Sequence, residues 1–327
     1  MNDKVTGKKV LVTGGAGFIG SNLVASLLEA RNEVVCLDNF STGRRKNIEE
    51  FIDNPSFRLL EGDIRNYDDC LKAVQGIEIV FHQAALGSVP RSLKDPVTST
   101  DVNIGGFVRM LQASREEGVD RFIYAASSST YGDHEGLPKV EEHIGNPLSP
   151  YAVTKFADEL FASVFAMNYG MKVIGLRYFN VFGPRQDPEG AYAAVIPKFI
   201  LQLLRGEQPV INGDGTVSRD FTHISNVVRA NHLAALVNRE DAINQVYNIA
   251  CGESTSINRM FEIIRDSLTV YDKNIGDVEP LFGPERKGDI RHSLASIEKA
   301  GKKLGYTPVI GIEEGLPDTV RWFRDNL

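Results

Sequence analysis

A short apolar run followed by three spaced glycines constrains the fold of this chain more than any other stretch. Residues 9–12 read as a strand, and a helical pattern of leucines begins shortly after Gly14, Gly17 and Gly20. A turn of this kind lets backbone N–H groups and a helix N-terminus approach a pyrophosphate. Glycines alone are weak evidence, but glycines between a strand and a helix are specific. The stretch therefore predicts a dinucleotide-binding turn.

The next apolar run, residues 33–37, ends at Asp38, which lies 18 residues after Gly20. An acidic residue at about this distance meets the adenosine ribose hydroxyls. A carboxylate there repels a 2′-phosphate, so we predict NAD rather than NADP. Arg44, Arg45 and Lys46 would favour NADP, but they lie farther along the chain than the discriminating position.

Further strand patterns alternate with helical ones at residues 57–65, whose end is polar, and at residues 77–82, 121–126 and 171–177. This alternation predicts an α/β fold with a Rossmann-type doubly wound parallel sheet. After Asn180 the pattern changes to short elements rich in proline and glycine. We therefore expect a cofactor-binding domain over residues 1–180 and a smaller C-terminal α/β substrate-binding domain over residues 181–327, with some chain crossover between them.

Tyr151 and Lys155 stand at positions i and i+4 of a predicted helix, so they share one face. A free tyrosine is a poor base near neutrality, but an ammonium group one turn away stabilises the phenolate. Tyr151 is therefore a candidate proton acceptor. The fifth strand ends in three hydroxyl residues, Ser127, Ser128 and Ser129, which could complete a proton relay. Against this, a Tyr/Lys pair can occur by chance, and serines are common in turns.

Composition excludes several classes of partner. The 327-residue chain has a net charge of −7 and no long basic run, so neither nucleic acid nor an anionic membrane is expected as the main partner. Its three cysteines are far apart, which fits neither a disulfide framework nor a zinc site, and we expect no metal. No apolar run spans a bilayer and no signal-peptide pattern is seen, so we expect a cytoplasmic protein.

Taken together, these residues resemble the extended short-chain dehydrogenase/reductase superfamily over nearly the whole chain. The likeness is closest to nucleotide-sugar 4-epimerases, such as those acting on UDP-galactose, and closer still to the branch acting on UDP-N-acetylhexosamines in bacterial surface-polysaccharide synthesis. The stretches that carry it are 85–92 (ALGSVPRS), 126–133 (ASSSTYGD), 177–183 (RYFNVFG), 190–197 (GAYAAVIP) and 286–293 (RKGDIRHS).

The resemblance implies roles for individual residues. Tyr151 would take the proton from the sugar O4, Lys155 would hold the nicotinamide ribose, and Ser127 would bridge O4 and Tyr151. The cofactor contacts expected from the strand ends and the resemblance are Gly14, Gly17, Phe18, Ile19, Gly20, Asp38, Asn39, Phe40, Ser41, Thr42, Gly43, Asp63, Ile64, Gln83, Ala84, Ala85, Tyr151, Lys155, Tyr178 and Val181. The expected substrate contacts are Gly87, Ser88, Arg91, Asn180, Ala194, Val195, Lys198, Asn212, Arg219, Arg286, Asp289 and Ser293.

Two small side chains bear on the sugar. Ser293 stands where some relatives place tyrosine or cysteine against the C2 substituent, and Ala194 where asparagine is common. Both side chains are small enough to leave room for an acetamido group at C2. We therefore expect NAD-dependent interconversion of UDP-GlcNAc and UDP-GalNAc through a 4-keto intermediate. Asn212 would edge the uracil, although many relatives have an aromatic residue there. His82 is expected to be a packed core residue.

Three alternatives stay open at this point. A nucleotide-sugar 4,6-dehydratase would carry an Asp-Glu pair where this chain has serines and Thr130. A UDP-uronic acid 4-epimerase or decarboxylase could use Arg91 to bind the C6 carboxylate. A non-catalytic NAD-binding regulator would not need the Ser127, Tyr151 and Lys155 set. The resemblance also implies a homodimer built from two helices of the cofactor half, residues 95–117 and 151–168.

Overall fold

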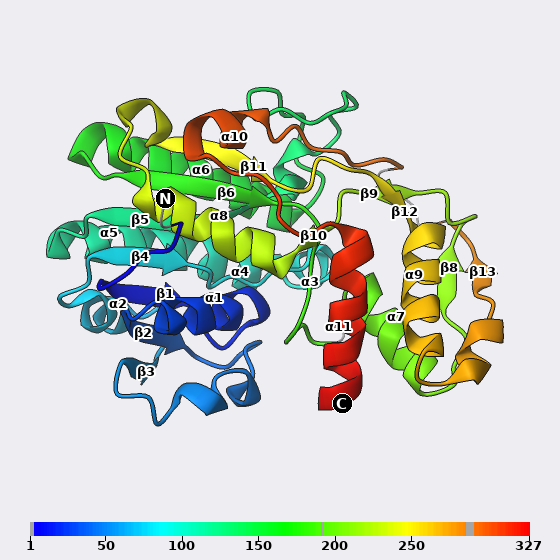
Figure 1. Cartoon of the computed structure of the whole chain (residues 1–327). Coiled ribbons are helices and arrows are strands. Elements are labelled where there is room, and N and C mark those ends of the chain that lie inside the picture. Colours follow the sequence, from blue (N-terminus) through cyan, green and yellow to red (C-terminus); the bar gives the residue numbers. More distant parts are fainter. Residues whose placement is uncertain (1–2, 191–192, 286–290) are drawn as a thin grey trace.

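A seven-stranded parallel sheet forms the centre of the molecule (Figure 1). The structure, a computed structural model, describes residues 3–190, 193–285 and 291–327. The strands lie in the order β11-β6-β5-β4-β1-β2-β3. Their bounds are β1 Lys9–Thr13, β2 Glu33–Asp38, β3 Phe57–Glu61, β4 Ile79–His82, β5 Arg121–Ser127, β6 Val173–Tyr178 and β11 Gln245–Ile249. The predicted doubly wound α/β fold is confirmed.

The strand order reverses beside β1, which pairs with β2 on one side and β4 on the other. Thr13 lies opposite Leu37 of β2 and His82 of β4, so the carboxyl ends of these strands meet at one edge. Ligands of open α/β sheets bind outside that edge, at the point of reversal. The glycine turn and Asp38 both lie there.

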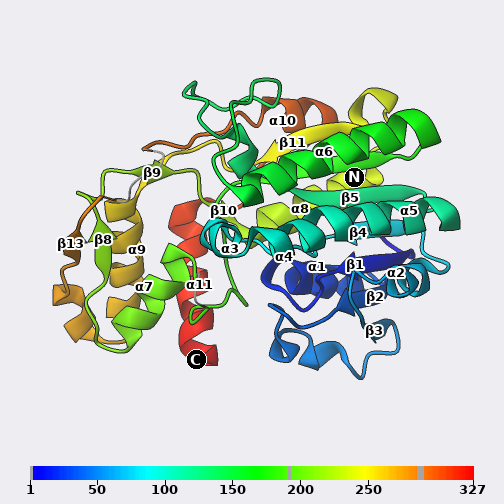
Figure 2. The ribbon, with the colours of Figure 1, turned by 180° about the vertical axis from the view of Figure 1, so that it is seen from behind.

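Helices cover both faces of the sheet (Figures 1 and 2). Helices α1, α8 and α10 pack on one face, and α2, α5 and α6 on the other. Their bounds are α1 Phe18–Glu29, α2 Tyr67–Val74, α5 Phe107–Glu117, α6 Pro150–Tyr169, α8 Ile224–Leu236 and α10 Glu298–Leu304. Each layer has its own buried cluster, which contains Leu23, Leu27 and Val227 on the first face and Phe107, Met110 and Phe165 on the second.

The helical pattern over residues 95–117 is interrupted in the structure. Helix α3 (Val89–Lys94) is followed by α4 (Pro96–Thr100), a π-helical turn (Asp101–Gly106) and then α5. Gly106 lies in this turn, where a Cβ atom would come within 2.5 Å of Ile64 Cδ1. Ile64 thus packs closely on the backbone at Gly106, and a larger residue there would displace the Ile64 side chain. Turns of this kind are often found at functional sites.

A smaller unit follows the sheet, to the right in Figure 1. Its helices α7 (Val195–Leu204), α9 (Ile257–Thr269) and α11 (Ile312–Asn326) share a separate buried cluster. Its short strands pair as β8 with β13, β9 with β12 and β7 with β10. The strand bounds are β7 Val181–Phe182, β8 Val210–Asn212, β9 Ser218–Arg219, β10 Thr222–His223, β12 Thr255–Ser256 and β13 Leu281–Gly283. The chain crosses over, because β11, α8 and α10 return to the sheet.

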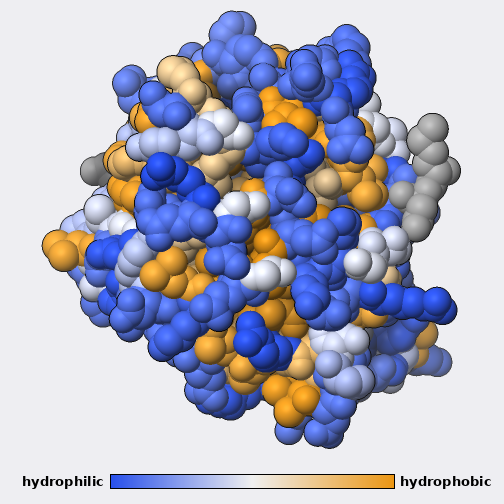
Figure 3. Space-filling model, turned by 90° about the vertical axis from the view of Figure 1, so that its left-hand side faces the viewer, coloured by the Kyte–Doolittle hydropathy of each residue, from blue (hydrophilic) through white to orange (hydrophobic). Residues whose placement is uncertain are grey.

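Short 3-10 turns lie at Arg45–Asn47, Glu49–Phe51, Ser128–Tyr131, Glu240–Ala242 and Lys273–Asp277. The end of the molecule away from α7 and α9 is mostly hydrophilic, with separate groups of hydrophobic residues (Figure 3). Within the described ranges, no helix is both long enough and apolar enough to cross a membrane.

Candidate active site

The glycine turn has the geometry of a cradle for a diphosphate. Gly17 precedes the first residue of α1 and provides no side-chain cap, and Gly17, Phe18 and Ile19 line a cavity at this helix N-terminus. Gly14 has φ +67°, and a Cβ there would lie 2.8 Å from the backbone Cα of Ala84. At Gly20 a Cβ would lie 2.1 Å from the carbonyl oxygen of Gly14. Only glycine fits at these two positions, and the site fits the pyrophosphate of NAD.

Asp38 connects the glycine turn to the loop after β2. Its Oδ2 accepts a hydrogen bond from the Ala16 N–H at 2.9 Å, and its Oδ1 accepts one from the Phe40 N–H at 2.8 Å. Burial raises the pKa of Asp38, while these two N–H groups act in the opposite direction. The carboxylate is thus fixed at the carboxyl end of β2, as an adenosine ribose site requires.

The basic residues after Asp38 have partners within the chain. Arg44 Nη2 lies 2.5 Å from Asp187 Oδ1, and Arg45 Nη2 lies 2.6 Å from Glu61 Oε2. Lys46 Nζ donates to a carbonyl oxygen in the last turn of α11. These contacts occupy the side chains that would otherwise favour a 2′-phosphate, which agrees with the prediction of NAD.

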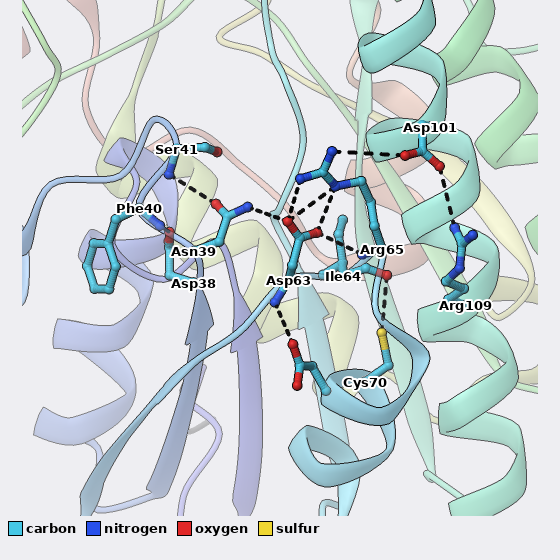
Figure 4. Close-up of polar contacts among 11 residues, drawn as sticks. Asp38, Asn39, Phe40, Ser41, Asp63, Ile64, Arg65, Cys70, Asp101 and Arg109 are labelled. Atoms are coloured by element: carbon cyan, nitrogen blue, oxygen red, sulfur yellow. Dashed lines mark hydrogen bonds and ion pairs between the residues drawn. The ribbon is translucent and has the colours of Figure 1, made fainter.

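Asp63 is the centre of a polar network at the end of β3 (Figure 4). Its carboxylate accepts hydrogen bonds from Asn39 Nδ2 at 2.8 Å and from Arg65 Nη2 at 2.7 Å. The guanidinium of Arg65 lowers the pKa of Asp63 to about 2. Arg65 also lies 4.0 Å from Asp101, which lies 3.8 Å from Arg109. The network joins the loop after β2 to the π-helical turn.

A cavity of about 410 Å³ runs along this edge of the sheet. Fifteen of the expected cofactor contacts line it: Gly14, Gly17, Phe18, Ile19, Gly20, Asp38, Asn39, Ser41, Thr42, Gly43, Asp63, Ile64, Gln83, Ala84 and Ala85. Four expected substrate contacts line it too: Gly87, Ser88, Arg91 and Ala194. The cavity therefore extends from the predicted adenosine site toward the predicted sugar site.

The Ser, Tyr and Lys candidates lie on neighbouring elements. Ser127 is the last residue of β5, and its Oγ accepts hydrogen bonds from Ser129 N–H at 3.1 Å and Ser129 Oγ at 2.9 Å. Ser128 and Ser129 begin a 3-10 turn that packs against α6. Ser149 caps α6 by accepting from the Ala152 N–H at 3.1 Å.

Tyr151 is therefore fixed in the first turn of α6. Its backbone N–H donates to Ser92 Oγ at 3.0 Å, and its side chain is half-buried. One turn on, Lys155 is buried, and its Nζ donates to the Ala125 carbonyl oxygen at 3.0 Å. Neither Tyr151 nor Lys155 lines the 410 Å³ cavity.

His82 lies in the core. Its ring stacks on Phe122 with centroids 5.8 Å apart, and Nδ1 lies 3.0 Å from Thr13 Oγ1. Burial lowers the pKa of His82 to about 3, and the charge of Lys155 adds to the effect. The imidazole is therefore neutral, which agrees with its predicted packing role.

Tyr178 and Gln83 form a hydrogen-bonded group with a residue that sequence patterns did not reveal. Tyr178 OH donates to Gln83 Oε1 at 3.2 Å and accepts from Asn231 Nδ2 at 2.9 Å. Asn231 also accepts from Gln83 Nε2 at 3.2 Å. Asn231 lies on α8, inside a helical pattern, so its side chain gave no signal of its own.

A second cavity of about 1270 Å³ lies between the sheet and the smaller unit. The expected contacts that line it are Asn180, Val181, Ala194, Val195, Lys198, Asn212 and Arg219. Asn180, with φ +33°, donates from Nδ2 to the Asp220 carbonyl oxygen at 3.1 Å. The buried Asp220 carboxylate in turn accepts from the N–H groups of Cys251, Gly252 and Ala295. Burial raises the pKa of Asp220 to about 6.

Several expected contacts lie elsewhere. Phe40 and Tyr178 line neither cavity, and Val181 lines the second rather than the first. Ser293 also lines neither cavity; its N–H donates to the Ser218 carbonyl oxygen at 3.1 Å. Arg286 and Asp289 lie outside the described residues.

The segment that lines both cavities was only partly identified from the sequence, as part of the stretch 190–197 that carries the resemblance. Gln186, Gly190, Ala193 and Ala194 line both of them, and only Ala194 was predicted as a contact. Arg185, just before the segment, has φ +68° and donates from Nη1 to the Ser21 carbonyl oxygen at 3.1 Å. The sequence indicated only that short elements rich in proline and glycine follow Pro184, and the position of this run beside both cavities depends on tertiary contacts.

Residues 10–250 match the model of the NAD dependent epimerase/dehydratase family. The chain belongs to this family. Its members use NAD, in agreement with the glycine turn and Asp38, and the predicted cofactor is confirmed.

Individual family members are similar over their full length. A UDP-glucose 4-epimerase of Mycolicibacterium smegmatis is 36% identical over 97% of this chain and 99% of its own. A solved UDP-N-acetylglucosamine 4-epimerase of Methanobrevibacter ruminantium, in complex with UDP-N-acetylmuramic acid, is 39% identical, with a TM-score of 0.92 over 99% of this chain and 100% of that one. A solved UDP-glucuronic acid 4-epimerase of Bacillus cereus, in complex with UDP-glucuronic acid and NAD, is 32% identical, with a TM-score of 0.87 over 98% and 100%.

Proposed function

We propose that this protein epimerises a UDP-hexose at C4, and that its substrate pair is UDP-GlcNAc and UDP-GalNAc. The observation that carries the proposal is the pair of cavities that meet at Gln186, Gly190, Ala193 and Ala194. One is shaped for a dinucleotide at the edge of the sheet. The other extends between the sheet and the smaller unit, where a second, sugar-bearing nucleotide would lie.

The chain's own residues would handle the proton. Tyr151 would accept the O4 proton, with Ser127 as the hydrogen-bond bridge and Lys155 as the neighbouring positive charge. NAD, when bound, supplies the hydride acceptor for C4. The resulting 4-keto sugar would turn about its diphosphate and be reduced on the opposite face. Tyr151 would then return the proton to O4.

The second cavity supplies groups suited to a diphosphate and a base. Asn180 and Arg219 line it, and Arg219 Nη1 donates to the Ser218 carbonyl oxygen at 2.9 Å. A guanidinium binds diphosphate oxygens bidentately, so we assign Arg219 to that role. Asn212, at the end of β8, would edge the uracil, and Lys198 lies on the first turns of α7.

The sugar preference rests on small side chains. Ala194 lies in the wall shared by both cavities, where it adds little bulk. Ser293 is proposed to border the C2 substituent although it lines neither cavity. The similar UDP-N-acetylglucosamine 4-epimerase of Methanobrevibacter ruminantium supports an acetylated substrate.

The test is incubation of the NAD-loaded protein with UDP-GlcNAc, UDP-Glc and UDP-GlcA, followed by product identification. We expect UDP-GalNAc from the first. In a Ser293→Tyr variant, overpacking of about 1–3 kcal/mol should lower the kcat/KM ratio of UDP-GalNAc to UDP-Gal roughly 5- to 150-fold. An unchanged ratio would remove Ser293 from the C2 pocket. No product from any UDP-sugar would favour a non-catalytic NAD-binding protein.

A uronic acid substrate is the second candidate. Arg91 lines the first cavity, as do Gly87, Ser88 and Ala194, and could bind a C6 carboxylate. The similar UDP-glucuronic acid 4-epimerase of Bacillus cereus supports this reading. Conversion of UDP-GlcA but not UDP-GlcNAc, lost in Arg91→Met, would replace our first proposal.

We also propose a division near residue 180 and a homodimer. Helix α6 exposes Val153, Leu160, Phe161, Val164 and Met167, which would be covered in a dimer of two copies packed through this helix. A monomer mass in light scattering at micromolar concentration would refute the dimer. The cytoplasmic location expected from the sequence stays a prediction.

A further inference from the structure

Lys155 is buried beside a carboxylate that the proposed mechanism does not use. The side chains of Lys155 and Asp158 are only 3% and 1% exposed, and Nζ lies 3.2 Å from Asp158 Oδ2. The same Nζ donates to the carbonyl oxygen of Ala125, in β5, at 3.0 Å. An ammonium group has three N–H donors. These two acceptors therefore occupy two of the donors and leave one for a ligand.

Other buried carboxylates of the site are bound differently. Glu159 uses both oxygens on Arg177, at 2.8 and 2.7 Å. The Asp220 carboxylate accepts three backbone N–H groups. Asp158 Oδ1, in contrast, is buried and has no hydrogen-bond partner within the described part of the chain. A buried carboxylate with an unused oxygen is costly, so a role in packing alone is a poor explanation for Asp158.

We propose that Asp158 is a positioning residue for Lys155, holding the ammonium group against the end of β5 in one place relative to Tyr151. Because Lys155 has only flexible methylene groups between its backbone and Nζ, a second acceptor is what restricts the ammonium to one location. The inference rests on the proposed roles of Tyr151 and Lys155.

The electrostatic surroundings agree with this arrangement. Burial raises the pKa of Asp158 to about 7, although Lys155 acts in the opposite direction. The charged or titratable groups around the pair include His82 on β4, Arg121 and Tyr124 on β5, Tyr131 on the 3-10 turn after β5, Arg177 and Tyr178 on β6, Tyr151, Glu159 and Tyr169 on α6, and Arg91, Lys94, Asp95, Asp101, Arg109, Arg115, Glu116 and Glu117 on the covering helices. His82 is neutral and Arg177 is held by Glu159. The carboxyl group that accepts a hydrogen bond from Lys155 is therefore that of Asp158.

The test compares Asp158→Ala with Asp158→Asn in the NAD-loaded protein. The readout is the near-ultraviolet absorbance of the phenolate as pH rises, with each background repeated as Tyr151→Phe to assign the signal. The alanine variant frees the ammonium, so the Tyr151 phenolate should appear about one pH unit higher, a tenfold change in the ionisation equilibrium. The asparagine variant keeps an acceptor oxygen in place and should stay within about half a unit of the wild type.

Glu159→Gln is the matched control, because it removes a neighbouring buried carboxylate that binds Arg177 rather than Lys155. It should lower stability and leave the phenolate titration where it is. The proposal would be overturned if the phenolate of Asp158→Ala appeared at the same pH as in the wild type. It would also be overturned if the phenolate of Asp158→Asn appeared at the same pH as in Asp158→Ala. The titration needs no sugar, so it stays informative if the proposed substrate is wrong. Failure of the wild type to convert any UDP-sugar would instead overturn the proposed function.

Discussion

Arg177 of β6 and Glu159 of α6 form a buried, bidentate ion pair one turn beyond Lys155. The two N–O distances are 2.8 and 2.7 Å, and Arg177 Nη1 also donates to the Glu141 carbonyl oxygen at 3.1 Å. The pair ties the helix that carries Tyr151 and Lys155 to β6, the second strand from one edge of the sheet. Because both charges are desolvated, loss of either one leaves the other buried without a partner.

Glu159→Gln should accordingly lower the free energy of unfolding by about 3–5 kcal/mol, the usual effect of breaking a buried ion pair. Urea unfolding measures it. As a comparison, Glu262→Gln removes an exposed carboxylate that lies 3.2 Å from Arg259, and it should change stability by less than about 1 kcal/mol. If both variants lost the same free energy of unfolding, the buried pair would be no more stabilising than the exposed one.

Gly20→Ala should disrupt the cofactor cradle. The new Cβ would lie 2.1 Å from the Gly14 carbonyl oxygen and 2.8 Å from Gly15 Cα, both of them backbone atoms. We expect a loss of about 1–3 kcal/mol in stability from overpacking, together with loss of NAD during purification. The cofactor content after denaturation is the measurement.

Gly311→Ala is the comparison for that variant, because a Cβ at Gly311 meets nothing within 4 Å. It precedes α11, so its cost should stay within about 1 kcal/mol and its NAD content should equal that of the wild type. If Gly20→Ala retains NAD, the turn can accommodate a Cβ atom at position 20, which would contradict the prediction.

Tyr151→Phe should reduce turnover by a factor of about 10²–10⁴, the usual contribution of a positioned general base. The hydroxyl is lost while the ring and the Ser92 contact to the backbone N–H remain. Steady-state kinetics with UDP-GlcNAc, next to NAD content and the thermal transition, separate chemistry from folding. A rate within about threefold of the wild type, far short of that range, would assign the proton to another group.

Asp158→Asn should change the pH dependence of stability in a defined direction. Burial raises the pKa of Asp158 to about 7, whereas an aspartate in an unfolded chain has a pKa of about 3.9. In that interval the folded carboxyl binds a proton that the unfolded one does not. Its contribution to stability is therefore complete below about pH 4 and is lost as the pH rises through about 7.

Asparagine does not titrate, so the variant should gain stability relative to the wild type as the pH rises from about 5 to about 7. The gain should be at most about 1.4 kcal/mol per pH unit. Urea unfolding across this range gives the difference, and Asp53→Asn, at an exposed carboxylate, should show none. If the stability of Asp158→Asn relative to the wild type fell as the pH rose, the prediction that the folded state raises the pKa of Asp158 would be wrong.

Local patterns in the sequence were enough to predict the sheet, the glycine turn and the position of Asp38 at the end of the second strand. Each of these depends on residues close together in the chain: the run before Gly14, the spacing to Asp38, and the i, i+4 relation of Tyr151 and Lys155. The π-helical turn was not predictable from local patterns, and its Gly106 packs against Ile64, a residue 42 positions earlier in the chain. Periodicity alone predicted one continuous helix there.

Long-range contacts explain the other gaps. Asn231 joins Tyr178 and Gln83 from a helix whose pattern indicates only packing. Asp158 reads as an ordinary polar position, and only the burial of its side chain against Lys155 distinguishes it. The family resemblance supplied the substrate-side candidates, of which Ser293 lines neither cavity and Arg286 lies outside the described residues.

The wall formed by Gln186, Gly190, Ala193 and Ala194 belongs to both cavities. Any shift of this wall on binding of one ligand enters the binding free energy of the other, and thermodynamic linkage makes the two effects equal in size. A substitution at Ala194 would therefore alter two dissociation constants at once. An engineer who enlarges the second cavity at this wall should also measure the dissociation constant of the dinucleotide, because the same residues line the first cavity.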